Sequence, residues 1–334
     1  MRIGLIARAD NSGLGTLSQM FFRNLKPTKV LIVQNGVFQI FPDRFAGAEK
    51  TIVPATGSIS RECMEWITTD VDLILSFETF YNFDVVAVAR KKGVKTVLMT
   101  MCELFPEHPQ AHPDLYLCPS QLDLDMMPTP KAYLPVPIET DKLHWRLRET
   151  ATTFIHTASH GGVSMRKGTP LLLQAMKHVK ADIKVKIYSW RKFHTDDPRV
   201  EVCIANFQNY WQLWREGDVL IYPQDANGIC LPVQEAYAAG LGVLTTNIYP
   251  FNTWLPKEMM FEPTEMYTRR FGNGLLPVQA ARIDPVVLAQ KIDEVAHSSI
   301  SSLSERGRDW AKANSWEVQR ANYLTLFENL CLQK

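Results

Sequence analysis

Short apolar runs alternate along the chain with longer segments in which apolar residues recur at helical spacing. The first run, residues 3–7, is followed by a turn that contains Gly13 and Gly15 and then by a helical pattern over 16–25. This order predicts a strand, a glycine turn and a helix. Strands are also expected at 30–33, 72–77, 96–101 and 115–118, and a helix at 84–92. Such alternation predicts a parallel sheet with helical crossovers.

The pattern restarts after a proline-containing segment at 131–138, which is the best candidate for a linker. Strands are expected at 153–157, 183–189, 219–222 and 242–245, and helices at 170–179, 211–216, 234–239, 285–296 and 316–330. The second half therefore predicts another α/β unit that begins near residue 151. A chain of 334 residues with 46% hydrophobic content is long enough for two domains.

Charge and cysteine content narrow the range of functions. Lys and Arg total 36 against 35 Asp and Glu, so the chain lacks the basic excess that dense contacts with nucleic acid phosphates require. Its six cysteines form no C-x-x-C pair, which argues against a disulfide framework or a zinc knuckle. No apolar stretch is long enough to span a membrane. We expect a soluble cytoplasmic protein, a monomer or weak dimer, with a small-molecule donor and no membrane partner.

The turn with Gly13 and Gly15 carries the first candidate binding residues. Glycines at the start of a helix let backbone N–H groups approach an anion, which indicates donor binding. The dinucleotide fingerprint needs a third glycine and an acidic residue further on, and neither is in place, so a nicotinamide cofactor is poorly supported. A tight turn with only a structural role fits the same residues.

A second glycine-rich segment, residues 160–168, follows the strand expected at 153–157. It contains His160 and Gly161 and, further on, Arg166 and Lys167. Glycines at such a turn bring the backbone close to a diphosphate, while an arginine and a lysine can neutralise its charge. A solvated basic loop is the alternative interpretation.

Residues 227–240, NGICLPVQEAYAAG, follow the strand expected at 219–222 and give the most specific signal in the chain. This segment resembles the C-terminal signature of retaining GT-B glycosyltransferases of the glycogen-synthase and sucrose-synthase-like group, E-G-F-G-L-P-x-x-E-A-x-A-x-G. The resemblance extends to Arg166-Lys167-Gly168, to residues 217–223 and to the linker at 134–138, in the order that the family requires.

The resemblance implies an α/β GT-B fold, in which two Rossmann-like parallel-sheet domains face each other across a cleft. The implied boundaries are an acceptor domain at 1–140, a nucleotide-sugar domain at 151–310 and a helix at 311–334 that packs back on the first domain. It also implies a hexosyl or pentosyl transferase that takes its sugar from a nucleoside diphosphate sugar, with a UDP-sugar favoured. The transfer would retain the anomeric configuration and need no metal or other cofactor.

The same resemblance assigns roles to residues of the second domain. Arg166 and Lys167 would bind the diphosphate, and Glu235 would bind the ribose hydroxyls. Backbone N–H groups from Gly228 to Leu231 would stabilise the leaving group. The donor-binding residues of this turn are Gly228, Ile229, Cys230 and Leu231.

The sequence also indicates two candidate catalytic residues, Asn227 and Glu103. Asn227 stands where the family has the first acidic residue of a glutamate pair, so a neutral amide replaces a charge. An amide can still bind a sugar through hydrogen bonds, but it cannot act as an acid or base, which puts donor identity and full activity in doubt. Glu103 follows the strand expected at 96–101 and could bind the acceptor or act as a base.

Metal sites find little support in the sequence. The pairs Asp70/Asp72 and Asp123/Asp125 resemble a D-x-D motif, and His108 and His112 lie four residues apart. The first acidic pair lies at the wrong end of its strand, and prolines interrupt any helix that would align the histidines. We interpret all of them as surface features.

The sequence leaves the acceptor open among a protein side chain, a glycan, a small molecule and a modified DNA base. Residues 8–15 resemble uncharacterised glycosyltransferases of bacteriophages, which would add a phage structural protein or hydroxymethylated DNA as acceptors, in the host cytoplasm. Two rival functions also stay open. One is a catalytically silent nucleotide-sugar or glycan-binding protein, which Asn227 favours, and the other is a GT-B-like epimerase.

Overall fold

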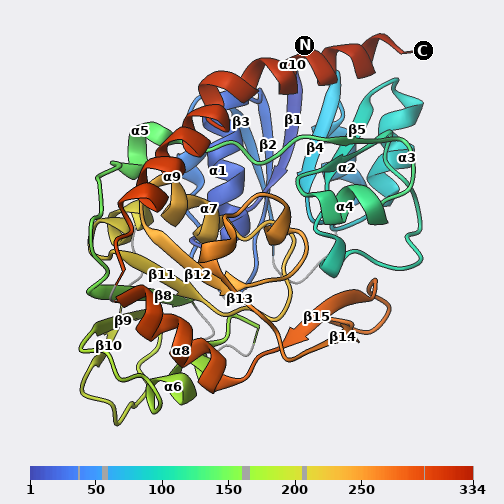
Figure 1. Ribbon diagram of the computed structural model, residues 1–334. Helices are drawn as coiled ribbons and strands as arrows, with labels where there is room; N and C mark the ends of the chain where they lie inside the picture. The colour runs from blue at the N-terminus through green and yellow to red at the C-terminus, as the bar shows by residue number, and fades with distance from the viewer. Residues whose placement is uncertain (37, 55–58, 160–165, 205–208, 297, 334) are drawn as a thin grey trace. The chain divides into compact units, whose positions relative to one another are not determined.

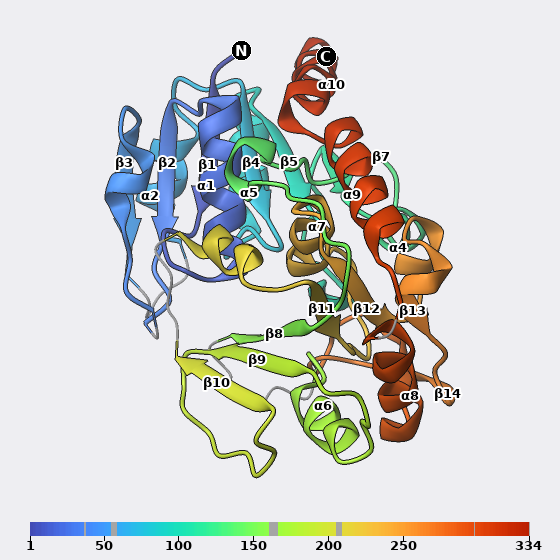
Figure 2. The same cartoon turned by 60° about the vertical axis from the view of Figure 1, so that its left-hand side comes forward.

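The computed structural model describes residues 1–36, 38–54, 59–159, 166–204, 209–296 and 298–333. The chain divides into two compact units (Figures 1 and 2). Unit 1 comprises Met1–Pro137, Arg270–Leu276 and Trp316–Lys334, and unit 2 comprises Ile138–Arg269 and Pro277–Ser315. The first boundary falls inside the segment 131–138 that was expected to be a linker.

Unit 1 is built on a seven-stranded parallel sheet of order β3-β2-β1-β4-β5-β6-β7, counted over the described residues. Its strands are β1 (Ile3–Ala7), β2 (Lys29–Val33), β3 (Glu49–Val53), β4 (Leu73–Phe77), β5 (Lys95–Met99), β6 (Leu115–Cys118) and β7 (Lys131–Tyr133). Its helices are α1 (Gly13–Leu25), α2 (Arg61–Ile67), α3 (Asp84–Lys91), α4 (Gln121–Met126) and α10 (Trp316–Leu332), with 3₁₀ turns η1 (Pro42–Phe45) and η2 (Cys102–Leu104). The central strands are buried along their whole length, as expected for a sheet covered on both faces.

The final helix of the chain belongs to unit 1, far in sequence from the rest of that unit. Its aromatic side chains Trp316 and Tyr323 pack edge-on around Phe21 of α1, with ring centroids 4.9 and 5.3 Å away. The Tyr323 hydroxyl also donates to the backbone oxygen of Pro135, at 2.9 Å. Helices α1 and α10 therefore share an apolar interface.

Unit 2 contains, within the part of the chain that is described, a six-stranded parallel sheet of order β10-β9-β8-β11-β12-β13 and a separate antiparallel hairpin, β14-β15. Its strands are β8 (Thr153–Ser159), β9 (Lys184–Ser189), β10 (Val200–Ile204), β11 (Val219–Tyr222), β12 (Gly242–Thr246), β13 (Met260–Phe261), β14 (Glu265–Arg269) and β15 (Val278–Arg282). Its helices are α5 (Thr140–Leu143), α6 (Thr169–Met176), α7 (Leu231–Ala238), α8 (Pro285–Ala296) and α9 (Ser301–Ala313), with 3₁₀ turns η3 (Tyr210–Arg215), η4 (Phe251–Thr253) and η5 (Lys257–Met259).

Alternation along the strands of unit 2 separates two apolar cores. Ile155 and Leu220 point into the core that contains α7, whereas Phe154 and Val219 point into the core that contains α6 and α8. Successive side chains of a strand point to opposite faces of the sheet, so each face packs against its own layer of helices.

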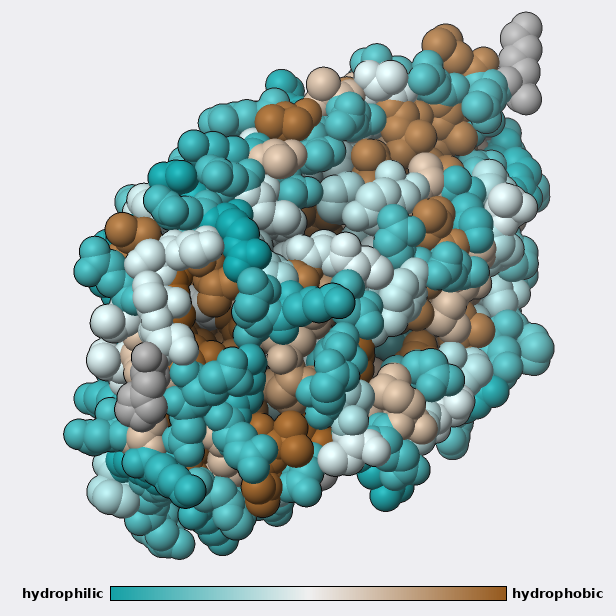
Figure 3. Space-filling view, in the orientation of Figure 1, coloured by the Kyte–Doolittle hydropathy of each residue, from teal (hydrophilic) through white to brown (hydrophobic). Residues whose placement is uncertain are grey.

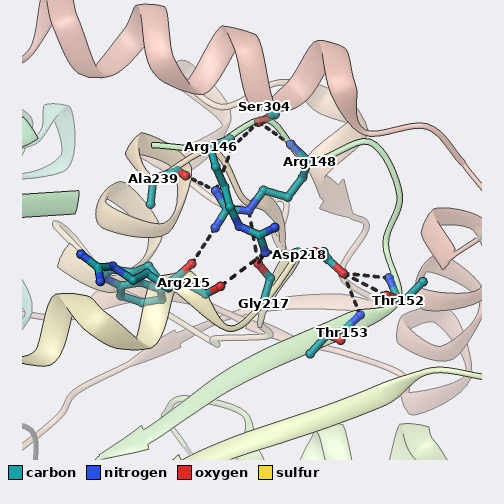
Figure 4. Close-up of polar contacts among 10 residues, drawn as sticks. Arg146, Arg148, Thr152, Thr153, Arg215, Gly217, Asp218, Ala239 and Ser304 are labelled. Carbon is teal, nitrogen blue, oxygen red and sulfur yellow. Dashed lines mark hydrogen bonds and ion pairs between the residues drawn. The ribbon is translucent and has the colours of Figure 1, made fainter. Parts of the chain in front are cut away.

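At the amino ends of these strands, the buried Arg148 holds several chain segments together (Figure 4). Its guanidinium donates to the carbonyl oxygens of Trp214 at 2.7 Å and Gly217 at 3.3 Å, and to that of Ala239 at the end of α7. The Asp218 carboxylate accepts hydrogen bonds from the backbone of residues 152 and 153, at 3.1 and 3.0 Å. This edge of the sheet is thereby cross-linked by charge-assisted hydrogen bonds.

Several elements differ from the sequence-based expectations. Residues 211–216 form a 3₁₀ helix in place of an α-helix, and the expected linker begins with the edge strand β7. The pattern also missed α9, because most of its residues are polar, and the hairpin β14-β15, in which β14 is largely exposed and only Val278, Ala280 and Ala281 of β15 are buried. Local packing at edges and surfaces is not encoded in hydrophobic periodicity alone.

The surface face in Figure 3 is mostly hydrophilic, with apolar groups scattered among polar ones. Among the helices that the structure describes, none is both long enough and apolar enough to cross a bilayer.

Candidate functional site

The sheet of unit 2 has a topological switch point between β8 and β11. After β8 the chain crosses through α6 to β9 on one side, and after β11 it crosses through α7 to β12 on the other. The loops that leave the carboxyl ends of these two strands therefore diverge, and open α/β sheets bind ligands at this position. Arg166 and Lys167 lie in the loop after β8, and residues 227–231 follow β11.

Gly168 brings these two loops into close contact. Its φ of 75° lies in the left-handed region, and a Cβ there would lie 2.0 Å from the backbone oxygen of Pro223. Any other residue would push the loops apart, since a real Cβ cannot approach an oxygen so closely. Packing therefore requires the glycine of the Lys-Gly step that was noted in the sequence.

His156 supports the site from within the sheet. Its Nδ1 lies 2.8 Å from the carbonyl oxygen of Ile221, and its Nε2 lies 2.8 Å from the Thr169 hydroxyl. Complete burial lowers the pKa of His156 to about 4, so the ring is neutral near pH 7. Since a carbonyl only accepts, Nδ1 carries the proton and Nε2 accepts from Thr169. This histidine links β8, β11 and the start of α6, and sequence analysis missed it.

Lys167 and Arg166 place two positive charges at the switch point. Both side chains are partly buried. The pKa of Lys167 is lowered to about 8, mainly by burial, while the nearby Cys230 opposes the shift and the positive charge of Arg166 adds a smaller downward contribution. A lysine whose charge is desolvated beside another cation is poised to bind an anion, which would restore the stability of the charged form.

Helix α7 begins at the same edge. Cys230 precedes it in the left-handed region, with a φ of 46°, and Pro232 lies in its first turn. The Gln234 amide donates to the backbone oxygen of Ile229 at 3.1 Å and fixes this turn. Ile229 and Cys230 are buried, Gly228 is buried and Asn227 is partly buried. The amino terminus of α7 directs its positive dipole end toward the loop that precedes it.

Glu235 lies one turn into α7 and is 8% exposed. The Tyr210 hydroxyl donates to its Oε1 at 2.9 Å. Burial raises the pKa of Glu235 to about 8, the hydrogen bond from Tyr210 lowers it, and the negative charge of Glu139 adds a smaller upward shift. The carboxyl group is therefore mainly protonated near neutral pH, and it can both donate to and accept from a hydroxyl.

Asp225, which sequence analysis did not single out, joins the loop after β11 to the hairpin. Its carboxylate pairs with Arg269 of β14, and its backbone oxygen accepts from Ala281 of β15 at 2.8 Å. Burial raises the pKa of Asp225, while Arg269 opposes that shift. The partner lies 44 residues away in sequence, so no local pattern could have indicated the pair.

Gly13 and Gly15 belong to unit 1, at the start of α1. A Cβ on Gly15 would lie 2.0 Å from the backbone oxygen of Asp10, so this glycine is required by packing. A Cβ on Gly13 would meet no atom within 4 Å, so this position has no such requirement. Ser12 caps the helix by accepting from the Gly15 N–H at 3.2 Å.

Glu103 lies in η2, just beyond the carboxyl end of β5, and is 2% exposed. Asp123 is fully buried near it and accepts from the Cys102 N–H at 2.8 Å. The pKa of Asp123 is raised to about 7, mainly by burial, while the hydrogen bond from Ser120 opposes the shift and the negative charge of Glu103 adds to it. The interpretation of Asp123 as a surface residue is therefore wrong. Its carboxylate accepts from the Cys102 N–H and from the Ser120 hydroxyl, and so it holds the loop that carries Glu103 to the start of α4.

His160 and Gly161 lie outside the described residues. The segment at 108–112 is not helical, and the His112 Nδ1 lies 2.6 Å from the Tyr116 hydroxyl. Asp72 is exposed and accepts from the backbone N–H of Arg2. In the part of the chain that the structure describes, no three His, Cys, Asp or Glu side chains gather as a metal site would require.

Comparison with known proteins identifies the fold of this chain. No family model matches the sequence, and no curated protein is detectably similar to it. Solved structures match over nearly the whole chain at low sequence identity. HepE of Anabaena in complex with UDP superposes with a TM-score of 0.72 at 12% identity, over 98% of this chain and 100% of that one.

Two further structures give the same result. Sucrose-phosphate synthase of Thermosynechococcus elongatus matches with a TM-score of 0.69 at 13% identity, over 99% of both chains. A glycosyltransferase of Rickettsia africae matches with a TM-score of 0.69 at 11% identity, over 100% of this chain and 99% of that one. Together with the two parallel sheets, these similarities establish that this chain has the GT-B fold.

Proposed function

We propose that this protein transfers a sugar from a nucleoside diphosphate sugar to a hydroxyl acceptor. The observation that carries the proposal is the pair of cations Arg166 and Lys167, with Lys167 desolvated, at the switch point of unit 2, beside the amino terminus of α7. Three features that favour an anion thus share one edge of a sheet: two side-chain charges and a helix dipole.

In this proposal, catalysis consists mainly of neutralising the leaving group. When the bond between the anomeric carbon and the diphosphate oxygen breaks, the nucleoside diphosphate gains negative charge. Lys167 and Arg166, together with the N–H groups at the start of α7, meet that charge as it develops. The attraction between Lys167 and the leaving group strengthens as the leaving group becomes more negative, so Lys167 stabilises the transition state more than the bound donor.

Glu235 is proposed to bind the ribose. Its carboxyl group, half-protonated near pH 8, can accept from one ribose hydroxyl and donate to another, while Tyr210 fixes its orientation. Asn227 would contact the donor sugar through its amide. Since an amide cannot transfer a proton at neutral pH, we assign Asn227 to sugar recognition.

A UDP-sugar is the proposed donor, of hexosyl or pentosyl type. HepE, whose fold this chain shares, was crystallised with UDP and with UDP-glucose, which supports that choice. We further propose that the transfer retains the anomeric configuration and needs no metal ion, as the resemblance of residues 227–240 implies. Positively charged side chains of the protein would then take the part that a divalent cation takes in other glycosyltransferases.

Calorimetric titration with UDP and UDP-glucose, each with Mg²⁺ and with EDTA, tests this proposal. We expect binding that EDTA leaves unchanged and that Lys167→Ala weakens. Lys180→Ala, which removes an exposed lysine of the same unit, serves as the matched control. Absence of binding by any UDP-sugar, or equal affinities for both variants, would overturn the donor assignment.

Asn227 specifically favours a second function, that of a nucleotide-sugar-binding protein without transferase activity. Release of UDP from bound UDP-glucose separates the two functions. An enzyme hydrolyses or transfers the sugar at a measurable rate that Lys167→Ala reduces, whereas a silent binding protein returns the donor intact.

A further inference from the structure

The hairpin β14-β15 is an antiparallel ribbon that is separate from the six-stranded sheet of unit 2 (Figure 1). Its two strands belong to unit 2, whereas the segment that joins them, Arg270–Leu276, belongs to unit 1. Strand β14 is largely exposed, and β15 buries only small or branched apolar side chains. A two-stranded hairpin is at best marginally stable in water by itself, so this one depends on the contacts that anchor it.

The first anchor lies in unit 2, at the loop after β11. The Asp225 carboxylate, whose side chain is 15% exposed, pairs with Arg269 of β14. The Asp225 carbonyl oxygen accepts from the Ala281 N–H of β15 at 2.8 Å, so both strands of the hairpin hold the same residue. Asp225 lies two residues before Asn227, at the start of the turn that we propose binds the donor. The hairpin is therefore attached to the proposed donor loop by a charge pair and by the backbone.

The second anchor lies within unit 1, at the loop after β5. The Arg270 guanidinium donates to both carboxylate oxygens of Glu107, at 2.8 and 3.1 Å. Backbone hydrogen bonds of 2.8 and 2.9 Å join residues 105–107 to residues 274–276 in an antiparallel arrangement. Residues 105–107 directly follow η2, which contains Glu103. The segment between the two strands is therefore attached to the loop that carries a candidate catalytic residue.

Two consecutive arginines thus hold two loops that carry candidate site residues. Arg269 pairs close to Asn227 in sequence and Arg270 close to Glu103, and the chain passes from unit 2 to unit 1 between the two arginines. Because the hairpin depends on both anchors, an event that tightens one anchor stabilises the hairpin and thereby the other anchor. Such coupling must act equally in both directions.

We propose that Arg269 and Arg270 are positioning residues, which couple donor binding at the loop after β11 to the order of the loop that carries Glu103. A donor bound beside Asn227 restricts the loop after β11, strengthens the first anchor and so keeps residues 105–107 paired. Each arginine acts through the carboxylate that it binds and not through contact with the donor. This inference rests on the proposed function, since that function places the donor beside the loop after β11.

Hydrogen exchange of the protein without any ligand tests the coupling itself. Arg269→Met removes the charge pair of the first anchor. We expect the Glu107 amide, at the second anchor, to exchange about 2- to 5-fold faster, which is the range that the loss of a partly exposed ion pair can give. Arg269→Lys keeps the charge and should restore most of the protection. Amides of β1, measured in the same samples, report whether unit 1 stays folded.

The matched control is Arg282→Met, at an arginine of the same hairpin. Its ion pair with Glu265 joins two exposed side chains of β14 and β15 and belongs to neither anchor. Exchange of the Glu107 amide should therefore be the same in Arg282→Met as in the wild type. Equal exchange rates in wild type and Arg269→Met, or equal acceleration by Arg269→Met and Arg282→Met, would overturn the coupling.

Addition of UDP tests the link between the coupling and the donor. Bound UDP should slow exchange of the Glu107 amide about 2- to 5-fold in the wild type, and Arg269→Met should abolish that slowing. By reciprocity, Glu107→Gln should weaken UDP affinity by a similar factor, although this residue is no part of the proposed donor site. A pair with only a structural role would not make exchange at one loop respond to a ligand at the other.

The outcomes separate this inference from the proposed function. UDP that binds the wild type without slowing exchange of the Glu107 amide, or that slows it equally in Arg269→Met, would overturn the inference. Absence of UDP binding would instead overturn the donor assignment. The exchange rates measured without ligand would then still decide whether Arg269 and Arg270 couple the two loops.

Discussion

The buried charged side chains at the two edges of the unit 2 sheet differ in whether they have partners that compensate their burial. At the amino edge, Arg148 donates to several carbonyl oxygens, and Asp218 accepts from the backbone ahead of β8 (Figure 4). At the carboxyl edge, Lys167 lies desolvated beside a second cation, and Glu235 is buried with its pKa raised. The first arrangement holds chain segments together. The second keeps Lys167 charged at a cost that a bound anion would offset, which is why we propose a functional role for this edge and a structural role for the other.

The largest expected effect is on stability, at the amino edge. Arg148→Met removes a guanidinium that is 2% exposed and leaves carbonyl oxygens without a donor. We expect the free energy of unfolding to fall by about 3 kcal/mol or more, as measured by urea denaturation. Arg146→Met, at an arginine whose side chain is 52% exposed, is the control and should change it by less than about 1 kcal/mol. Equal losses for the two variants would contradict the assigned role of Arg148.

At the carboxyl edge, the expected effect is on binding and not on folding. Lys167→Met should weaken UDP affinity about 10- to 100-fold, because a charge-assisted hydrogen bond to phosphate is lost. The unliganded protein should be as stable as the wild type or slightly more stable, since burial disfavours the charged lysine. Calorimetry and thermal unfolding of the same samples measure both quantities. A large loss of stability would mean that Lys167 is structural.

The pH dependence of donor binding also tests the role proposed for Lys167 at the carboxyl edge of the unit 2 sheet. Since the pKa of Lys167 is lowered to about 8, the lysine loses its charge as the pH rises through that value. UDP-glucose affinity should therefore be constant below pH 8 and fall above it, by up to about tenfold per pH unit. The fall should be much smaller in Lys167→Met, in which only Glu235, proposed to contact the ribose, still ionises near pH 8. A titration in which wild type and variant lose affinity in parallel would assign the dependence to another group.

The smallest effect is expected at Glu235. Glu235→Gln keeps the shape of the side chain and its ability to donate and accept, while it removes the charge. We expect UDP affinity to fall about 2- to 10-fold, with less change in the binding of inorganic pyrophosphate, because the ribose contact alone is altered. Comparable losses for UDP and pyrophosphate would place Glu235 beside the phosphates.

Hydrophobic periodicity predicted the central strands of both sheets, because fully buried parallel strands are continuous apolar runs. It also placed Arg166, Lys167 and the segment 227–231 after the two strands that meet at the switch point. Periodicity missed the hairpin β14-β15, whose strand β14 is largely exposed, and the helix α9, most of whose residues are polar. Asp123 was misassigned because a carboxylate that binds a backbone N–H 21 residues away looks like any acidic residue in the sequence.

The sequence by itself determined the alternation of strands and helices and the residues that follow each strand, because these depend on local patterns. Only the tertiary structure decided how those residues act. The pKa of Lys167 and of Glu235 depends on burial by segments distant in the chain, and the tautomer of His156 depends on a carbonyl 65 residues away. Solvation and long-range pairing arise only when the chain has folded, because both depend on which groups have left water together.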